Sequence, residues 1–365
     1  MNTTAINNAT LAPSVVRADE FCWQPGCFAV VNDDYTAFYI VHCTALVSLA
    51  ISFFTSAYIL WDAIVVNKRY SKIGHRFPIY LSVFDMCWST FHSLDHYVIL
   101  VPQYYPTHPL TDILGASLQI FLVAPATMVA IISASVYMNM FKQWKIDFGR
   151  YDWKLFALCL GIPIVMVIIG LPLGVFGPSG YFNYLRQDLE HSLLYNIIWS
   201  ALPLVINFSI TAFCALSIRH EIRCNAAAYK PSATASTAGV SDVSSNKPKS
   251  SATQEATIRA TRRINMFAIV FLIQWFPMVL FTIAAFSGFG HWLIALTVVV
   301  FVNGGGTMNC YAYKQLYGGH QQQIKAAEET IPNQTMTNAS SKLTSPRALV
   351  KMSNTDHSKG TNMRI

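Results

Sequence analysis

The stretch "FDMCWSTFHSLDHY", from Phe84 to Tyr97, lies in an apolar run long enough to cross a membrane, yet it contains four ionisable side chains. At 100° per residue, one sector of about 120° on a helix collects six polar or aromatic side chains: Asp85, Trp88, Ser89, His92, Asp95 and His96. A charged group that faces lipid at mid-bilayer costs at least ~2.5–3.5 kcal/mol. We therefore expect this helix face to line the interior of a helix bundle or a wet cavity.

The composition indicates a membrane protein. Only 12% of the 365 residues are charged and 53% are hydrophobic, whereas soluble domains average about 25% charged residues. Seven apolar runs are long enough, at roughly 20 residues, to cross a bilayer as helices. They are Ala37 to Val66, Phe77 to Val101, Ile113 to Tyr137, Leu155 to Phe176, Ser192 to Ile218, Ile264 to Phe286 and Trp292 to Tyr313. The sequence predicts an all-α membrane protein, a seven-transmembrane helix bundle.

The basic residues predict the orientation of the bundle. Of the 25 Lys and Arg residues, 23 fall in the loops of one side and in the tail, and the other side holds Arg17 and Arg186. Basic loops remain on the cytoplasmic side, so we expect the N-terminus outside and the C-terminus inside. The net charge of +7 then belongs to inside loops next to anionic lipid, and we expect no nucleic-acid partner. The chain is predicted to be a multi-pass protein of the plasma membrane.

Three kinds of segment are expected along the chain. Residues 1–36 form an extracellular tail, and residues 37–317 form the seven-helix domain. The third inside loop, about residues 226–257, is rich in Ser, Thr and Ala, and residues 318–365 have a similar composition. Such segments cannot bury enough apolar surface to fold, so both are predicted to be disordered.

The extracellular tail carries two kinds of modification site. Asn2-Thr3-Thr4 and Asn8-Ala9-Thr10 are acceptable glycosylation sequons. Cys22 and Cys27 flank a Pro-Gly turn in an oxidising compartment. We therefore predict glycosylation at Asn2 and Asn8 and a disulfide between Cys22 and Cys27.

Two motifs lie in the last two spans. In "QWFP", residues 274–277, Pro277 removes one helix hydrogen bond and bends the sixth span, next to the bulky Trp275. In "NCYAY", residues 309–313, Asn309 requires a polar partner within the last span. Asp85 is a natural one, because the third to seventh runs contain no Asp, Glu, Lys, Arg or His.

Together these features resemble a G-protein-coupled receptor. Leu81-x-x-x-Asp85 is similar to the Leu-Ala-x-x-Asp of the rhodopsin-like group. Gln274-Trp275-Phe276-Pro277 resembles its Cys-Trp-x-Pro, and Asn309-Cys310-Tyr311-Ala312-Tyr313 resembles its Asn-Pro-x-x-Tyr with Cys in place of Pro. The match in topology covers about Ala37 to Tyr317, and the match in motifs is partial.

The resemblance implies roles for five residues. Asp85 and Asn309 would belong to a polar, sodium-binding network, so the resemblance implies no cofactor other than a sodium ion near Asp85. Trp275 and Pro277 would form the hinge that moves on activation, and Tyr313 would turn inward with it. A receptor of this kind is not an enzyme, and its partners would be a heterotrimeric G protein and a small-molecule or short-peptide ligand.

The chain also departs from the family pattern. The inner end of the third span reads Tyr137-Met138-Asn139-Met140, with no Asp/Glu-Arg-Tyr. The first span has no Gly-Asn pair, and the outer end of the third span has no Cys. The chain therefore resembles divergent receptors, such as the cyclic-AMP-receptor-like or fungal nutrient-receptor groups. Because the last span has no Lys, we expect no retinal Schiff base.

Candidate sites lie at both ends of the bundle. At 1.5 Å per residue, the outer part of the polar stripe is about 22–28 Å along its helix, and the expected ligand contacts there are His92, Asp95, His96 and Trp88. Histidine titrates near neutrality, so we expect the ligand response to depend on pH between about 5 and 8. The expected G-protein-facing residues at the inner end are Arg219, Arg223, Arg259, Arg262 and Arg263.

Two alternatives remain open. His92 and His96, four residues apart on one helix face, have the spacing of zinc ligands, and Asp95 lies beside them. This pattern is similar to the seven-span zinc hydrolases related to adiponectin receptors and alkaline ceramidases. The second alternative is a non-signalling membrane protein whose polar stripe serves packing.

Overall fold

Each of the seven apolar runs corresponds to helix in the computed structural model, which describes residues 26–30, 34–68, 73–186, 189–228, 249–286 and 292–317. The α-helices are α1 (Tyr35–Trp61), α2 (Ile73–Leu100), α3 (Leu110–Lys142), α4 (Trp153–Gly170), α5 (Ser192–Asn196), α6 (Leu202–Ala228), α7 (Lys249–Phe286) and α8 (Trp292–Asn303). Three short helical segments accompany them: the π-helix η2 (Asp62–Val66) after α1, the 3₁₀-helix η3 (Arg150–Asp152) before α4, and the π-helix η4 (Ile197–Ala201) between α5 and α6. The helix Gly305–Tyr317 follows α8 after a bend of 41°.

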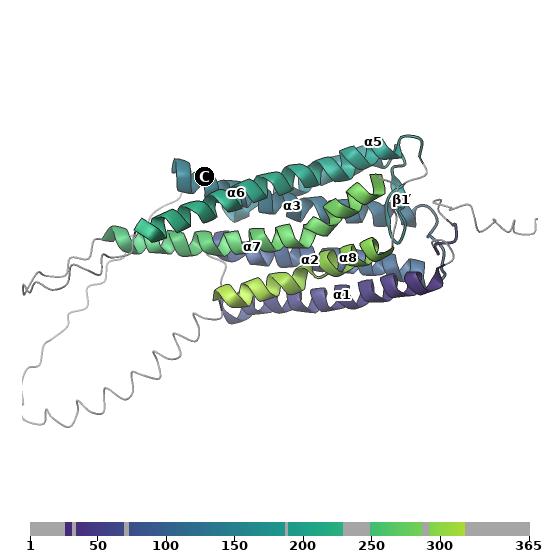
Figure 1. Cartoon of the computed structure of the whole chain (residues 1–365), viewed down its shortest axis with the longest axis horizontal. Helices are drawn as coiled ribbons and strands as arrows, with labels where there is room; N and C mark the ends of the chain where they lie inside the picture. The colour runs from purple at the N-terminus through teal and green to yellow at the C-terminus, as the bar shows by residue number, and fades with distance from the viewer. Residues whose placement is uncertain are drawn as a thin grey trace, which may run out of the picture. The chain divides into compact units, whose positions relative to one another are not determined.

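The helices pack lengthwise. Figure 1 shows α1, α2, α3, α6 and α7 running along one common direction. α1 packs against α2 and α8, and α3 packs against α2, α4, α6 and α7. α3 is therefore the interior helix of the bundle, and it is lined with small buried residues such as Ala124, Ala126 and Ala130. The predicted helix bundle is confirmed.

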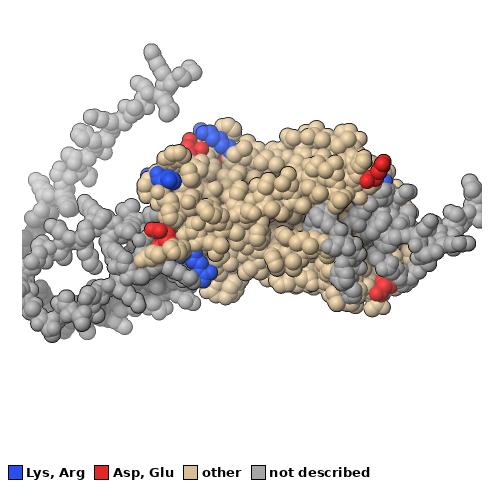
Figure 2. Space-filling model, turned by 45° about the horizontal axis from the view of Figure 1, so that its top comes forward, with Lys and Arg blue, Asp and Glu red and all other residues tan. Residues whose placement is uncertain are grey.

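The outer surface of the bundle is apolar, as a bilayer requires. Large hydrophobic side chains such as Val47, Phe54, Ile168 and Leu216 are exposed. In Figure 2, the charged side chains of the described residues lie near the two ends of the bundle, and the face between them has none. In the described part of the chain, five helices are long and apolar enough to cross a membrane, or six if the bent pair after Trp292 forms one span.

α2 is not among those helices, because its polar stripe lowers its hydropathy. The stripe nevertheless faces inward: Ser89, His92, Asp95 and His96 are all at most 5% exposed. A polar face that is buried inside protein avoids the cost of facing lipid. The expectation drawn from the sequence for this helix face is confirmed.

The loop between α4 and α5, which is predicted to lie outside, contains a short β-hairpin within the otherwise helical fold. Residues 176–178 (β1, Phe176–Pro178) and residues 183–185 (β2, Asn183–Leu185) form an antiparallel hairpin, with Gly177 opposite Tyr184. Gly180 turns the chain with φ = 77°, a conformation that glycine adopts without strain. The strands are only three residues long, so the sequence offers no alternating pattern that would have predicted them.

The boundaries of the third inside loop also differ from the prediction. α6 continues to Ala228 and α7 begins at Lys249, so both helices extend into the stretch expected to be disordered. Residues 249–257 contain no Gly or Pro, which removes the usual obstacles to extending a helix. Asn2, Asn8 and the tail from residue 318 lie outside the described residues. Cys27 is disulfide-bonded, and its predicted partner Cys22 lies outside the described residues as well.

Candidate functional site

A small cavity lies next to the hairpin, between the halves of the helices that are predicted to face outside. It is lined by residues of α2, α3, the hairpin loop, α7 and α8: Trp88, His92, Leu118, Leu122, Phe182, Tyr184, Met278, Val298, Val299, Val302 and Asn303. Its volume is about 20 Å³, enough for about one water molecule. We call it the outer cavity. No charged side chain lines it.

Asp95, one of the predicted ligand contacts, holds the hairpin in place over this cavity. Its Oδ1 accepts a hydrogen bond of 2.6 Å from Asn183 Nδ2, and its Oδ2 accepts one of 3.1 Å from the Asn183 backbone N–H. The Oδ1 of Asn183 in turn accepts from Thr111 Oγ1 of α3 at 2.7 Å. All three residues are fully buried. Asp95 is thus directed to the hairpin backbone, and the hairpin joins α2 to α3.

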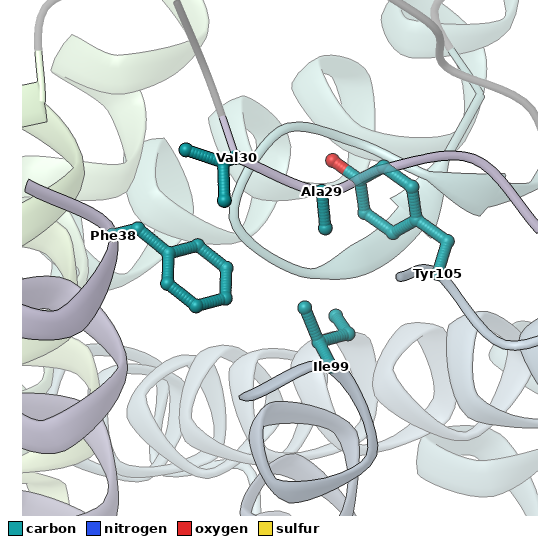
Figure 3. Packing of buried hydrophobic residues seen from close by; sticks show 5 residues of the cluster. All are labelled: Ala29, Val30, Phe38, Ile99 and Tyr105. Atoms are coloured by element: carbon teal, nitrogen blue, oxygen red, sulfur yellow. The ribbon is translucent and has the colours of Figure 1, made fainter. Parts of the chain in front are cut away.

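A second layer covers the hairpin from outside. Residues 26–30 pair with the first outside loop, where Tyr105 N–H donates to Cys27 O at 2.9 Å and Ala29 N–H donates to Gln103 O at 2.8 Å. The hydroxyl of Tyr105 donates to the Gly180 carbonyl in the hairpin turn. Figure 3 shows Tyr105 above Ile99, with Ala29, Val30 and Phe38 packed around them. The described loops thus form two connected layers at this end of the bundle.

His92 and His96 form a buried cluster with His42 of α1, a residue that the sequence analysis missed. The Nδ1 atoms of His42 and His96 are 2.8 Å apart. The rings of His92 and His96 stack with centroids 4.6 Å apart. A lone histidine in an apolar run gives no sign of its partner, so His42 could not have been selected from sequence. The pH dependence expected of these histidines stays a prediction.

Trp88 joins the outer cavity to a second one deeper in the bundle. The inner cavity is bounded by α2, α3, α7 and the helix beyond the bend: Leu81, Phe84, Asp85, Trp88, Phe121, Pro125, Val129, Phe271, Gln274, Trp275 and Asn309. Trp88 lines both cavities. Its Nε1–H donates to Asn303 Oδ1 at 3.2 Å, and its ring meets that of Trp275 edge-on at 5.8 Å.

Asp85 and Asn309 make the contact expected from the sequence. Asn309 Nδ2 donates to Asp85 Oδ2 at 2.8 Å. One turn further in, the hydroxyl of Tyr313 donates to Asp62 Oδ2 at 2.7 Å. Asp62 lies at the inner end of the first span and was not selected from sequence. The last span is thus bonded to α2 at mid-depth and to the end of α1 at the inner surface.

The sodium ion suggested by the family resemblance does not fit this site well. Side-chain oxygens that line the inner cavity come from Asp85, Gln274 and Asn309, while α3 presents only apolar side chains there. Hard cations take six or more oxygen ligands. The side chains that line the inner cavity do not supply such a ligand set.

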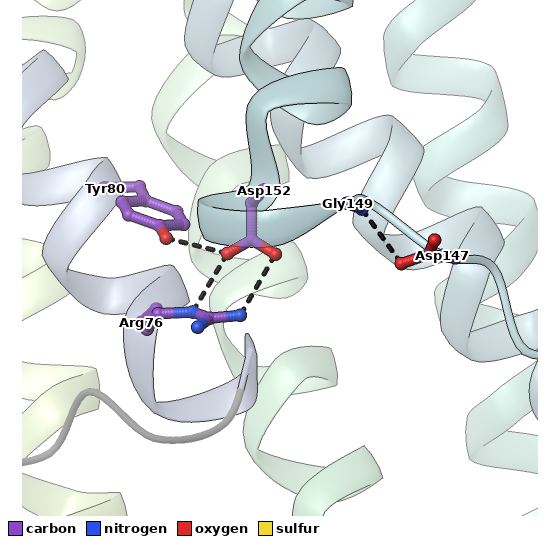
Figure 4. A network of polar contacts seen from close by, with 5 residues as sticks. All are labelled: Arg76, Tyr80, Asp147, Gly149 and Asp152. Carbon is purple, nitrogen blue, oxygen red and sulfur yellow. Dashed lines mark hydrogen bonds and ion pairs between the residues drawn. The ribbon is translucent and has the colours of Figure 1, made fainter. Parts of the chain in front are cut away.

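A polar clamp lies at the inner end of α2. Arg76 contacts both carboxylate oxygens of Asp152, at 3.0 Å from Nη2 and 2.9 Å from Nε, and Tyr80 donates to Asp152 Oδ2 at 2.7 Å. In Figure 4 both side chains point from α2 toward Asp152, while Asp147 turns away to the Gly149 N–H. That N–H, together with Lys154, lowers the pKa of Asp147. None of these residues was selected from the sequence.

The predicted G-protein-facing arginines lie at the inner ends of α6 and α7. Arg219 is exposed on α6. Arg223 belongs to α6, and Arg259, Arg262 and Arg263 belong to α7, but their side chains lie outside the described residues. All five arginines thus belong to helices, at the ends of α6 and α7 that face the third inside loop of the prediction.

Together, the helices and the hairpin over the outer cavity define a membrane protein built as a seven-helix bundle. Among solved structures, the chain is similar to the crystal structure of squid rhodopsin, with a TM-score of 0.59 and 14% sequence identity over 89% of this chain and 99% of that chain. This similarity confirms the predicted seven-helix fold, which the chain shares with rhodopsin. No protein-family model and no curated protein matches the sequence.

Proposed function

We propose that the chain is a G-protein-coupled receptor that binds a small ligand in the outer cavity and signals to a heterotrimeric G protein through α7. The observation that carries the proposal is the position of Trp88. This ring is a wall of both cavities, it is bonded to α8 through Asn303, and it contacts Trp275 of α7. A ligand that displaces Trp88 must therefore also disturb α7 and α8.

The lining of the outer cavity favours an uncharged ligand. Its walls are Leu, Val, Met and aromatic side chains, and no Asp, Glu, Lys or Arg lines it. Burying an unpaired charge here would be strongly unfavourable. The ring nitrogens of His92 and the Nδ2 of Asn303 are buried; the two side chains interact with each other, but neither makes a hydrogen bond of normal geometry through these atoms. Buried polar groups normally have a partner, so the ligand would supply one hydrogen-bonding group to this end of the cavity.

Binding requires the cavity to open. Its present volume of about 20 Å³ is far below the ~300–1,000 Å³ of typical ligand pockets. Opening would separate the hairpin from the helices or move α7 about Pro277, where the helix lacks one hydrogen bond. Movement of α7 would carry the basic residues at its inner end, among them Arg259, Arg262 and Arg263, relative to α6. That surface is the proposed contact for the G protein.

The test is nucleotide exchange on candidate G proteins, with the protein in membranes, across matched panels of uncharged and charged small metabolites. The proposal expects exchange that depends on an uncharged compound and that is lost in Leu122→Trp, which fills the outer cavity. Phe54→Ala, a change on the exposed surface of α1, should respond as wild type. Exchange driven equally well in Leu122→Trp would place the ligand elsewhere.

The zinc-hydrolase alternative finds no ligand set to build on. Among the described residues, no group of three or more His, Cys, Asp or Glu side chains is arranged to hold a metal ion. Asp95 is bonded to Asn183 rather than directed toward His92 and His96.

A further inference from the structure

The last span is broken at three consecutive glycines, Gly304 to Gly306. α8 ends at Asn303, the next helix begins at Gly305, and the two axes differ by 41°. The span contains no proline to explain the break. In a straight α-helix, the N–H of Gly306 would donate to the carbonyl of Val302, four residues earlier. Here each of these two groups is bonded to a different neighbouring helix.

Val302 and Gly306 find their partners on α7 and α1. Gln274 Nε2 of α7 donates to the Val302 carbonyl at 3.2 Å. The N–H of Gly306 donates to Ser52 Oγ of α1 at 2.9 Å. Gln274 is 5% exposed and Ser52 2%, so water does not compete for these bonds. One helix hydrogen bond is thus divided between two side chains.

The glycines allow the neighbours to come this close. A Cβ at Gly305 would overlap the side-chain amide of Gln274, and a Cβ at Gly306 would overlap Ser52 and Ser56. Glycine is required where a neighbouring segment approaches the backbone this closely. Gln274, Ser52 and the glycines Gly304 to Gly306 therefore form one structural element that holds the last span in its bent form.

We propose that this element is a two-state switch in the last span. In the bent state, Gln274 and Ser52 hold Val302 and Gly306 apart; in the straight state, Val302 and Gly306 bond to each other. Gln274 directly precedes Trp275, so movement of α7 withdraws Gln274 and straightens the span. Asn309 and Tyr313, which lie beyond the bend, then move relative to Asp85 and Asp62. The switch is a property of the helices and needs neither the ligand nor the G protein.

The expected movement is large enough to measure. Removing a 41° bend at Gly305 displaces the helix at Tyr311, six residues further on, by roughly 6 Å at 1.5 Å per residue. Three exposed side chains are suitable for labelling: Tyr311 is 60% exposed, Leu158 of α4 is 53% exposed and Phe213 of α6 is 59% exposed. Spin labels at Tyr311 and Leu158, and at Tyr311 and Phe213, report this movement by pulsed electron resonance, once the exposed Cys43 and Cys224 are replaced by Ser.

The experiment compares four proteins: wild type, Gln274→Met, Ser52→Ala and the double variant. Met keeps the length of Gln and cannot donate a hydrogen bond. Each single variant leaves one group without its partner, whereas in the double variant Val302 and Gly306 satisfy each other. We expect the label distances of the double variant to shift by several ångströms, and its melting temperature to fall by less than the sum of the two single changes.

Thr297→Val is the matched control, because Thr297 Oγ1 bonds the Leu293 carbonyl within α8, away from the bend. Its label distances should equal those of wild type. Unchanged label distances in the double variant would overturn the proposal. Additive losses of melting temperature would overturn it as well. The outcome is independent of the nucleotide-exchange assay, so either proposal can fail alone.

Discussion

Asp95 of α2 and Asn183 of β2 form a fully buried pair in which the Asn183 amide donates to the carboxylate across 2.6 Å. The pair joins residues 88 positions apart in the chain and holds the hairpin over the outer cavity. Asp95 was expected to contact a ligand directly. The structure assigns it a contact that shapes the cavity instead, and a ligand role for Asp95 stays a prediction.

Asn183→Ala is expected to destabilise the outer end of the bundle. It leaves the Asp95 carboxylate with a single backbone donor and removes the bond to Thr111, and bonds to charged groups are worth about 1.5–3 kcal/mol each. We expect the free energy of unfolding to fall by about 2–3 kcal/mol, which is measured as a lower melting temperature in detergent. Asn196→Ala, which removes a bond within one helix turn, is the control. Equal melting temperatures for the two variants would show that the hairpin is not held by Asp95.

Asp152→Ala should loosen the second inside loop. It removes the acceptor of both Arg76 and Tyr80, although the partial exposure of Arg76 at 25% reduces the loss. We expect a destabilisation of about 1–3 kcal/mol, measured by thermal unfolding. Asp147→Ala in the same loop is the matched control, because Asp147 is exposed at 83% and should matter little. If both variants unfold at the wild-type temperature, the clamp does not stabilise the inner end.

Alkaline pH should weaken the outer cover through Tyr105. Burial, with Asp95 and Tyr181 nearby, raises the pKa of Tyr105 above its ordinary value of 10.0. The unfolded chain therefore releases this proton first, so the stabilising contribution of Tyr105 is complete below about pH 10 and is lost as the pH rises above it. Between about pH 9 and pH 11, the melting temperature of wild type should decrease by more than that of Tyr105→Phe. Tyr104→Phe, at an exposed neighbouring position, should follow wild type, and parallel curves for all three proteins would contradict the prediction.

The fold was predictable because its signals are local. Seven apolar runs, the distribution of Lys and Arg, and the phase of the polar stripe in α2 are each read from short segments. The Asp85–Asn309 contact was also predictable, since a buried carboxylate without a cation needs a polar partner and the NCYAY motif of the last span supplies the Asn309 amide. These inferences required only helix geometry and the cost of polar groups in lipid.

The missed residues are those whose partner is far away in the sequence. His42 and Asp62 lie 20 residues apart in the first apolar span, and nothing in the sequence around them indicates His96 or Tyr313 as the partner. The hairpin is stabilised by Asp95 and Thr111 rather than by its own three-residue strands. The three glycines of the last span do not by themselves predict a bend, which depends on the contacts with Gln274 and Ser52. Tertiary contacts decide all these features.

The decisive measurement is ligand-dependent nucleotide exchange on the G protein by Asp85→Asn and Trp275→Ala, compared with wild type and Phe54→Ala at equal expression. If Trp88 transmits ligand binding to α7 and to the Asp85–Asn309 pair, both variants should shift the concentration of half-maximal response, or its amplitude, by roughly tenfold, the scale of typical coupling free energies. Phe54→Ala should match wild type. Wild-type responses from both Asp85→Asn and Trp275→Ala would contradict the proposed route of the signal.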